Sequence, residues 1–236
     1  MPRTPPTHHL TVDGIVINVT LKRMKTMTLR VRTPDAQVVV SAPLRTPDAL
    51  IRTFVTTKLP WIRTHQARIL QRAAQQTPDL TDNGTARVWG RTIPIAITSA
   101  ARRTIRLAED VIFMTLPDEG EPATRQALLD GLYRRLVTSA LPALVAHWSP
   151  IMQVTVQKTF VQKMKTRWGS CNYRAHHIRL NSDLAMYPPQ CLEYVVVHEL
   201  VHLLEASHNQ RFYALMTQFY PDWPAVRAQL RHGGEC

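Results

Sequence analysis

The sequence predicts an α+β fold, in which a β-rich N-terminal region with a helix precedes a mainly helical C-terminal core that holds a small antiparallel sheet. Two observations lead to this prediction. In the first half, short segments alternate apolar and polar residues, which is typical of half-buried strands. In the last third, apolar residues recur with the periodicity of α-helices, in some segments along one face and in one segment nearly all round.

Turn-rich segments divide the chain of 236 residues. TPDLTDNG at residues 77–84 reads as a loop between subregions, and PDEGEP at residues 117–122 as a second linker. We place the domain boundary at the second, between a basic β-rich region of residues 1–116 and a helical region of residues 117–236. A chain of this length buries a core in one large domain or in two small ones, so the regions can also pack as one unit.

The elements of the first half begin with a hairpin. In TMTLRVR, residues 26–32, apolar and polar residues alternate, and a TPDA turn separates this strand from QVVVSA at residues 37–42. A helix follows with Thr46 as its N-cap and Pro47 at its first position, and we expect Pro60 to break or kink it. Four short strands come next, with the sequences TARVWG, TIPIAIT, RRTIRLA and DVIFMTL.

The second half begins with a long helix, expected from about residue 123 to residue 148 and interrupted near Pro142. Two strands, MQVTVQKTF and HHIRLNSDL, then flank the segment KTRWGSC. The next helix, from Pro188 to Ala206, carries apolar residues nearly all round and should be buried. Ser207, with Gln210 three residues later, forms a capping-box pattern that starts a further helix.

Composition excludes several classes of protein. With 44% hydrophobic and 19% charged residues, the chain is neither collagen-like nor a disordered polyelectrolyte. No apolar run approaches the roughly 20 residues of a membrane-spanning helix, and the start, MPRTPPTHHL, lacks the apolar centre of a secretory signal. Three cysteines, at positions 171, 191 and 236, argue against a disulfide scaffold. We therefore expect a cytoplasmic protein with no membrane partner.

The formal net charge of +12 is unevenly distributed. Residues 1–110 hold 17 Lys and Arg against 7 Asp and Glu, whereas residues 111–236 hold 12 against 10. Such an excess attracts anions, including phosphate esters and nucleic acid. It is equally the solvated face of an arginine-rich chain, because 23 of the 29 basic residues are Arg. Nucleic acid is therefore a weakly supported partner, and no zinc-finger or RNP signature strengthens it.

One motif stands out for its chemistry, a His-Glu-x-x-His sequence. His198 and His202 are four residues apart, so on a helix their imidazoles project from the same face. Each can then reach one Zn²⁺ at about 2.0–2.1 Å. His208 lies beyond the expected helix end, where a turn can return it to complete a set of three ligands. Glu199 stands beside the site, where a carboxylate can take a proton from the attacking water.

Two other interpretations of this motif are weaker. The histidines could hydrogen-bond to backbone groups inside a buried helix, but three histidines and an acid among apolar residues are costly to bury without a metal. The spacing also matches the metzincin pattern HExxHxxGxxH, but Glu205 occupies the glycine position, where it disfavours the left-handed turn. We discard the metzincin interpretation.

A closer resemblance involves several segments, KTRWGSC, HIRLN, YPP, YVVVHELVHLLEASHNQRFYALM and YPDW. Together they resemble the YgjP-like metallopeptidase family, a minimal zincin-type group, and the front half of the chain is also similar to that family. The resemblance implies that the C-terminal region is a zincin-like metallohydrolase domain with one zinc ion per chain. It implies zinc ligands at His198, His202 and His208 and a general base at Glu199.

Four cations near the expected strands are further candidates to stabilise an oxyanion or hold a phosphate. We favour Arg167 as a catalytic residue, because RWGSC combines a tight glycine turn, an aromatic residue and a charge. Lys163, Lys165 and Arg179 are weaker, and a solvated strand face explains Lys163 and Arg179 at least as well. Cys171 reads as a packed thiol. The side chains of residues 205 and 209 are candidates to hydrogen-bond a ligand imidazole.

Three functions are consistent with these residues. The first is a zinc-dependent hydrolase, above all a metallopeptidase, in which Glu199 activates water and an extended peptide pairs with an edge strand. The second is a nucleoside-triphosphate pyrophosphohydrolase that uses the same metal site, since the basic excess suits anionic substrates. The third is a nucleic-acid-associated protease, in which the basic front half binds DNA or RNA. Peptide and nucleotide substrates both remain open at this point.

Overall fold

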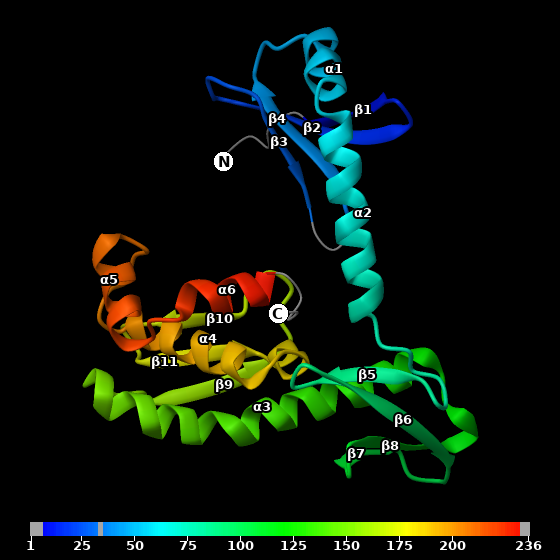
Figure 1. Cartoon of the computed structure of the whole chain (residues 1–236), viewed down its shortest axis with the longest axis vertical. Helices are drawn as coiled ribbons and strands as arrows, with labels where there is room; N and C mark the ends of the chain where they lie inside the picture. The colour runs from blue at the N-terminus through cyan, green and yellow to red at the C-terminus, as the bar shows by residue number, and fades with distance from the viewer. Residues whose placement is uncertain (1–6, 33–34, 232–236) are drawn as a thin grey trace. The chain divides into compact units, whose positions relative to one another are not determined.

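The computed structural model describes residues 7–32 and 35–231, apart from the side chains of residues 72–76 and 119. The first six residues and Cys236, on which the sequence predictions also drew, lie outside these ranges. Helices and strands are mixed along the chain, which confirms the α+β class (Figure 1). Internal contacts divide the chain into two compact units, Met1–Thr77 and Pro78–Cys236, and each is described by itself.

The first unit is a four-stranded sheet covered by two helices. The strand order is β1-β2-β4-β3, with β2 and β4 parallel and the outer pairs antiparallel. Alternate residues of β2 and β4, among them Ile17 and Val40, are fully buried against Ile51, Val55 and Ile62 of the helices. The elements are β1 (Thr7–Val12), β2 (Ile15–Lys22), β3 (Thr28–Val31), β4 (Val38–Pro43), α1 (Asp48–Thr56) and α2 (Leu59–Gln76).

Two predictions about this unit are confirmed. β3 and β4 pair as an antiparallel hairpin, with Thr28 opposite Ser41, although residues 33 and 34 of its turn lie outside the described ranges. The helical segment is broken between α1 and α2, and Pro60 lies in the first turn of α2, where a missing N–H costs nothing. Pro47 rather than Thr46 is the N-cap of α1.

The second unit contains a four-stranded sheet that the sequence assigned to the N-terminal region. Its order is β5-β6-β8-β7, and its inward side chains join the same hydrophobic core as the C-terminal helices. The contacts therefore divide the chain at the loop of residues 77–84 instead of after residue 116, because this sheet needs the later helices to cover its apolar face. The strands are β5 (Thr85–Val88), β6 (Arg91–Ser99), β7 (Thr104–Ala108) and β8 (Val111–Leu116).

A 31-residue helix, α3 (Pro122–Met152), runs through this unit. The interruption expected near Pro142 is wrong, since both Pro142 and Pro150 lie inside the helix. A proline removes one N–H donor, but buried residues on the same helix, including Leu141 and Met152, hold both sides of it in the core.

The third sheet is small and mixed. The two segments that were expected to form an antiparallel sheet contain β9 (Lys158–Gln162) and β11 (His177–Asn181), which pair parallel, whereas β10 (Gly169–Asn172) pairs antiparallel with β11. β10 forms an edge of this sheet. The sequence predicted strands on either side of KTRWGSC but none within it, and β10 begins there. Short 3₁₀ turns, η1 (Pro117–Glu119) and η2 (Ser182–Met186), precede α3 and α4.

Three C-terminal helices complete the unit, α4 (Pro189–Val201), α5 (Gln210–Phe219) and α6 (Trp223–Arg231). α4 is buried on nearly all sides, as predicted, and contacts α3, α5, α6 and β10. Figure 1 shows it between α3 and α6. α4 ends at Val201, five residues before the end predicted at Ala206. Within the described ranges, no helix has the length and apolar character needed to cross a membrane.

Candidate metal centre

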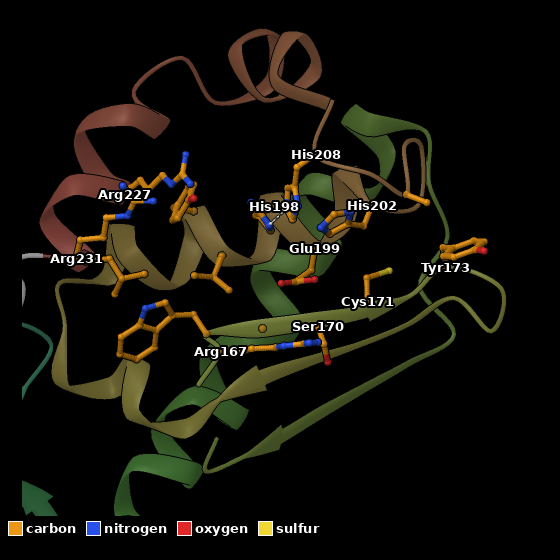
Figure 2. Close-up of a pocket in the computed structure, with 16 residues that line it drawn as sticks. Arg167, Ser170, Cys171, Tyr173, His198, Glu199, His202, His208, Arg227 and Arg231 are labelled. Carbon is orange, nitrogen blue, oxygen red and sulfur yellow. Dashed lines mark hydrogen bonds between the residues drawn. The ribbon is translucent and has the colours of Figure 1, made fainter. Parts of the chain in front are cut away.

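The end of α4 and the start of α5 bring three histidines together. His198 lies in the last turn of α4, and His202 follows as its C-cap. A turn then returns the chain, so that Nε2 of His208 lies 3.0 Å from Nε2 of His198. One nitrogen from each of the three imidazoles lies within 4.8 Å of the others. Figure 2 shows the rings facing one another above Glu199.

The connecting turn is held by its own polar groups. The backbone N–H of Glu205 donates to the carbonyl of Val201 at 2.9 Å, and the Glu205 carboxylate accepts from the N–H and hydroxyl of Ser207. The side chain of Asn209 accepts from the N–H of Phe212 at 3.0 Å. Asn209, not Ser207, therefore caps α5, and these bonds occupy the side chains that were expected to contact a ligand imidazole.

A backbone carbonyl orients one of the rings. The carbonyl oxygen of Glu205 lies 3.2 Å from Nδ1 of His202, and because a carbonyl only accepts, Nδ1 carries the proton. The lone pair of Nε2 is then directed into the site. Such outer contacts fix the tautomer and orientation of metal-binding histidines in general.

Burial favours the neutral form of His198 and His202. Burial, with smaller contributions from the neighbouring His202 and His208, lowers the pKa of His198 to about 3. Burial also lowers the pKa of His202. Phe212, fully buried, lies below the cluster with its ring centre 4.6–4.9 Å from those of the three histidines. A metal ion binds the neutral form of imidazole, so this protonation state suits a metal site.

The donor set fits a tetrahedral ion such as Zn²⁺. Two nitrogens that bind one zinc at 2.0–2.1 Å lie roughly 3.3 Å apart. The His198–His208 distance of 3.0 Å is close to this value, and all three nitrogens lie within 4.8 Å of one another.

Glu199 lies beside this cluster in a tight contact with β10. Its side chain is 4% exposed, and burial raises its pKa to about 8, against the opposing effect of Arg167. A Cβ atom on Gly169 would lie 2.5 Å from Oε1 of Glu199 and 2.8 Å from its Cγ. Gly169 is part of a strand and has no positive φ, so the expected tight glycine turn is wrong. Only glycine leaves room for the carboxyl group.

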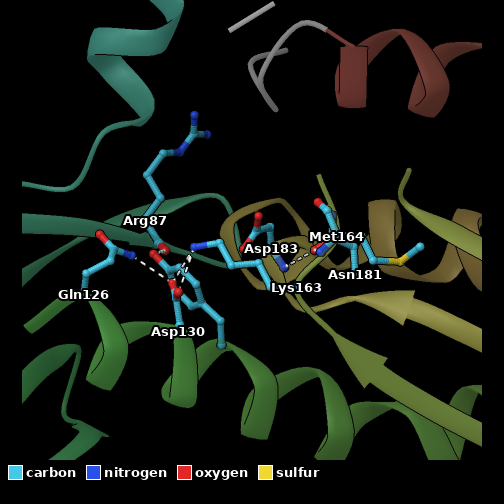
Figure 3. Close-up of polar contacts among 8 residues, drawn as sticks. Arg87, Gln126, Asp130, Lys163, Met164, Asn181 and Asp183 are labelled. Atoms are coloured by element: carbon cyan, nitrogen blue, oxygen red, sulfur yellow. Dashed lines mark hydrogen bonds and ion pairs between the residues drawn. The ribbon is translucent and has the colours of Figure 1, made fainter. Parts of the chain in front are cut away.

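The loop before β10 is held by a buried asparagine that the sequence analysis did not single out. Asn181, 3% exposed, donates to the carbonyls of Met164 at 2.9 Å and Arg167 at 3.0 Å. It accepts from the N–H groups of Met164 and Asp183 (Figure 3). All four bonding positions of the amide are used, and they fix the chain that leads into Gly169.

The candidate cations separate into two groups. Both carboxylate oxygens of Asp130 accept from Nζ of Lys163, at 2.7 and 2.8 Å, which ties this lysine to α3 (Figure 3). The guanidinium of Arg179 lies 5.2 Å from the ring centre of Phe160. Of the four cations considered from the sequence, Arg167 lines the cavity beside Glu199, whereas Lys163, Lys165 and Arg179 do not.

That cavity has a volume of about 680 Å³ and lies between α4, β10 and α6. Cys171 is half-buried in its wall, and burial, together with Glu199, raises the pKa of its thiol to about 11. Further residues that the sequence did not indicate also line the cavity, among them Tyr194, Arg227 and Arg231. The spacing of four between the two arginines on α6 is the signal that could have indicated them.

Comparison with known proteins identifies the family of this chain. The family model for the YgjP-like metallopeptidase domain matches residues 25–233 of this chain. The protein is therefore a metal-dependent peptidase by class. The chain belongs to the YgjP-like family.

The solved structures that resemble the chain include two metallopeptidase zymogens. They are jannalysin of Methanocaldococcus jannaschii, with a TM-score of 0.34, and abylysin of Pyrococcus abyssi, with a TM-score of 0.35. Each is 16% identical, and each match covers 38% of this chain and 92% of that chain. No curated protein matches the chain.

Proposed function

We propose that the protein is a zinc-dependent peptidase in which His198, His202 and His208 hold the metal and Glu199 is the general base. The observation that supports this most strongly is the convergence of three imidazole nitrogens beside a buried carboxyl group. Three protein ligands are typical of catalytic zinc sites, in which a coordination position stays open, whereas structural sites use four.

Zinc is the metal that we propose, because nitrogen donors in tetrahedral geometry suit it. His198, His202 and His208 would hold the ion, which would supply Lewis-acid activation of a carbonyl group and of a neighbouring water molecule. A cation bound by the histidines would favour the ionised form of Glu199, which accepts the proton of the attacking water and delivers it to the leaving amine. The contact with Gly169 and the surrounding burial hold its carboxyl group in one position for both transfers.

Arg167 and β10 would act on the substrate. Arg167 lines the cavity on the side of Glu199 opposite the histidines, where its guanidinium can stabilise the oxyanion that forms at the scissile carbonyl (Figure 2). β10 is an edge strand with backbone groups available to an extended peptide, which can pair with it as an additional strand. Such pairing would place the scissile bond beside Glu199.

A nucleotide substrate is a second candidate. Three arginines, Arg167, Arg227 and Arg231, line the cavity, and guanidinium groups bind phosphate as well as carboxylate. A nucleoside-triphosphate pyrophosphohydrolase could use the same metal ligands and base.

Metal-dependent turnover distinguishes the two. The protein is stripped with a chelator, reloaded with zinc, and incubated with an unfolded protein and with a panel of nucleoside triphosphates. The proposal predicts cleavage of the unfolded protein that disappears on chelation and returns with zinc. Turnover of nucleotides alone, or cleavage that persists without metal, would contradict it.

A further inference from the structure

The cavity is strongly basic at the end formed by α6. Arg227 and Arg231 are four residues apart, so their side chains leave the same face of the helix and enter the cavity that contains His198 and Glu199. Tyr194 lines the same end, one turn before His198 on α4. Figure 2 shows the two arginines together on one side of the histidine cluster.

Among the residues that the structure describes, no acidic group balances the charge of these two arginines. Arg227 is half-buried with its guanidinium carbon 5.7 Å from the ring centre of Trp223, and no described carboxylate forms an ion pair with it or with Arg231. Glu199 is the one acidic residue among the described residues that line the cavity. Elsewhere in the same unit Arg91 pairs with Asp110 through two bonds. Two neighbouring guanidinium groups without such a partner repel each other and favour an anion.

The direction of β10 indicates which part of a peptide would reach them. β10 runs from Gly169, in contact with Glu199, towards Cys171 and Tyr173, which lie on the side of the histidines away from α6 (Figure 2). Antiparallel pairing is the more stable arrangement for an added strand. A peptide bound in this way runs against β10, so the residues that follow the scissile bond point towards α6.

We propose that Arg227 and Arg231 form a subsite for a carboxylate on the C-terminal side of the scissile bond. This inference rests on the proposed peptidase function. The carboxylate belongs either to an Asp or Glu side chain or to the C-terminus of a short peptide, since both present the same planar pair of oxygens to a guanidinium fork. The protein then selects substrates that are acidic just after the cleaved bond.

The first test maps cleavage sites. Zinc-loaded wild-type protein and an Arg227→Gln/Arg231→Gln variant digest the same mixture of unfolded proteins, and mass spectrometry identifies the new termini. Acidic residues, or the peptide C-terminus, should be enriched in the first three positions after bonds cut by the wild type, and the double variant should lose this enrichment. Arg134→Gln is the matched control, because Arg134 is exposed on α3 and does not line the cavity. It should retain the wild-type preference.

The second test measures binding without turnover. The Glu199→Gln protein is titrated by fluorescence anisotropy with peptide pairs taken from the mapped sites, Glu against Gln after the scissile bond, and free against amidated C-terminus. A charged hydrogen-bonded contact should make the acidic member bind about tenfold more tightly. This advantage should vanish when Arg227→Gln and Arg231→Gln are added. The pair that shows it identifies the source of the carboxylate.

The outcomes separate this inference from the proposed function. If the wild type cleaves no peptide, the peptidase proposal fails, and the anisotropy titration with acidic and neutral test peptides still decides the role of the arginines. A preference for acidic residues before the scissile bond would overturn the subsite as placed here. So would equal binding of both members of each pair, or a preference that survives the double substitution.

Discussion

The two units of the molecule differ in how much of their charge is balanced. Residues 1–77 hold 12 Lys and Arg against 3 Asp and Glu, whereas residues 78–236 hold 17 against 14. Yet the described polar or charged residues that are fully buried, Asn181, Ser182 and Glu199, all belong to the second unit, as does the histidine cluster. The first unit has most of the excess charge, and the second has the groups that are expensive to bury.

This difference shows which kind of polar residue indicates function. An exposed cation is solvated and costs little wherever it stands. A buried carboxyl group or amide must be compensated by hydrogen bonds or by an ion, so its presence needs a reason. In this chain the net charge of +12 first drew attention to the N-terminal region, but the buried groups indicate the site in the C-terminal unit. The following predictions test that contrast.

The largest effect is expected from loss of a metal ligand. In His202→Ala, two imidazoles remain, and we expect zinc affinity and peptide hydrolysis to fall by at least about 100-fold, beyond the loss typical of outer contacts. Elemental analysis of the purified protein and the rate of cleavage measure both. His147→Ala, on the exposed side of α3, should change neither. Full zinc content in the His202 variant would show that His202 is not a metal ligand.

A smaller effect follows from adding one methyl group opposite the base. In Gly169→Ala the new Cβ would lie 2.5 Å from Oε1 of Glu199, so the carboxyl group must move. Displacing a general base costs about 100-fold in kcat, and zinc should still bind. Gly131→Ala is the matched control, because its Cβ meets only the end of Arg135 at 3.8 Å. Unchanged kcat in the Gly169 variant would mean that the position of Glu199 is not critical.

Asn181 should affect stability and activity together. Asn181→Asp keeps an acceptor but loses the donor to the carbonyls of Met164 and Arg167. Each buried carbonyl left unpaired costs about 1–3 kcal/mol, and the loop that carries Arg167 loosens. Urea unfolding and kcat report the two effects. Asn172→Asp, whose side chain only accepts a bond from Ala175, should stay within about 0.5 kcal/mol of the wild type. Equal stability of the two variants would contradict the role of Asn181.

The smallest effect is expected in the basic unit. Lys22, Arg23, Lys25 and Arg45 lie near the same end of the first sheet, because β2 and β4 are parallel. Replacing all four by Gln should change kcat/KM on an uncharged peptide by less than about twofold, since exposed charges away from the site contribute little. A tenfold loss, or binding of nucleic acid that weakens steeply with salt in the wild type, would show that this unit takes part in function.

The sequence predicted best the features that lie within one element. The i and i+4 spacing placed His198, Glu199 and His202 together because one helix carries them all. Gly169 and Asn181 were not assigned their roles, because those roles depend on contacts between elements far apart in the chain. β10, with the sequence GSCN, has low intrinsic strand propensity and forms through pairing with β11. Pro142 is a further case in which local sequence does not predict the structure, since tertiary packing overrides its tendency to interrupt α3.

The proposed function requires that the carboxyl group of Glu199, beside three metal-binding imidazoles, activates the attacking water. Glu199→Gln tests it most directly, because the amide occupies the same space but cannot accept the proton. Zinc content and the rate of peptide cleavage are measured on the same preparation. We expect one zinc per chain, as in the wild type, with cleavage reduced by about 100-fold or more. A variant that binds zinc and keeps the full hydrolytic rate would contradict it.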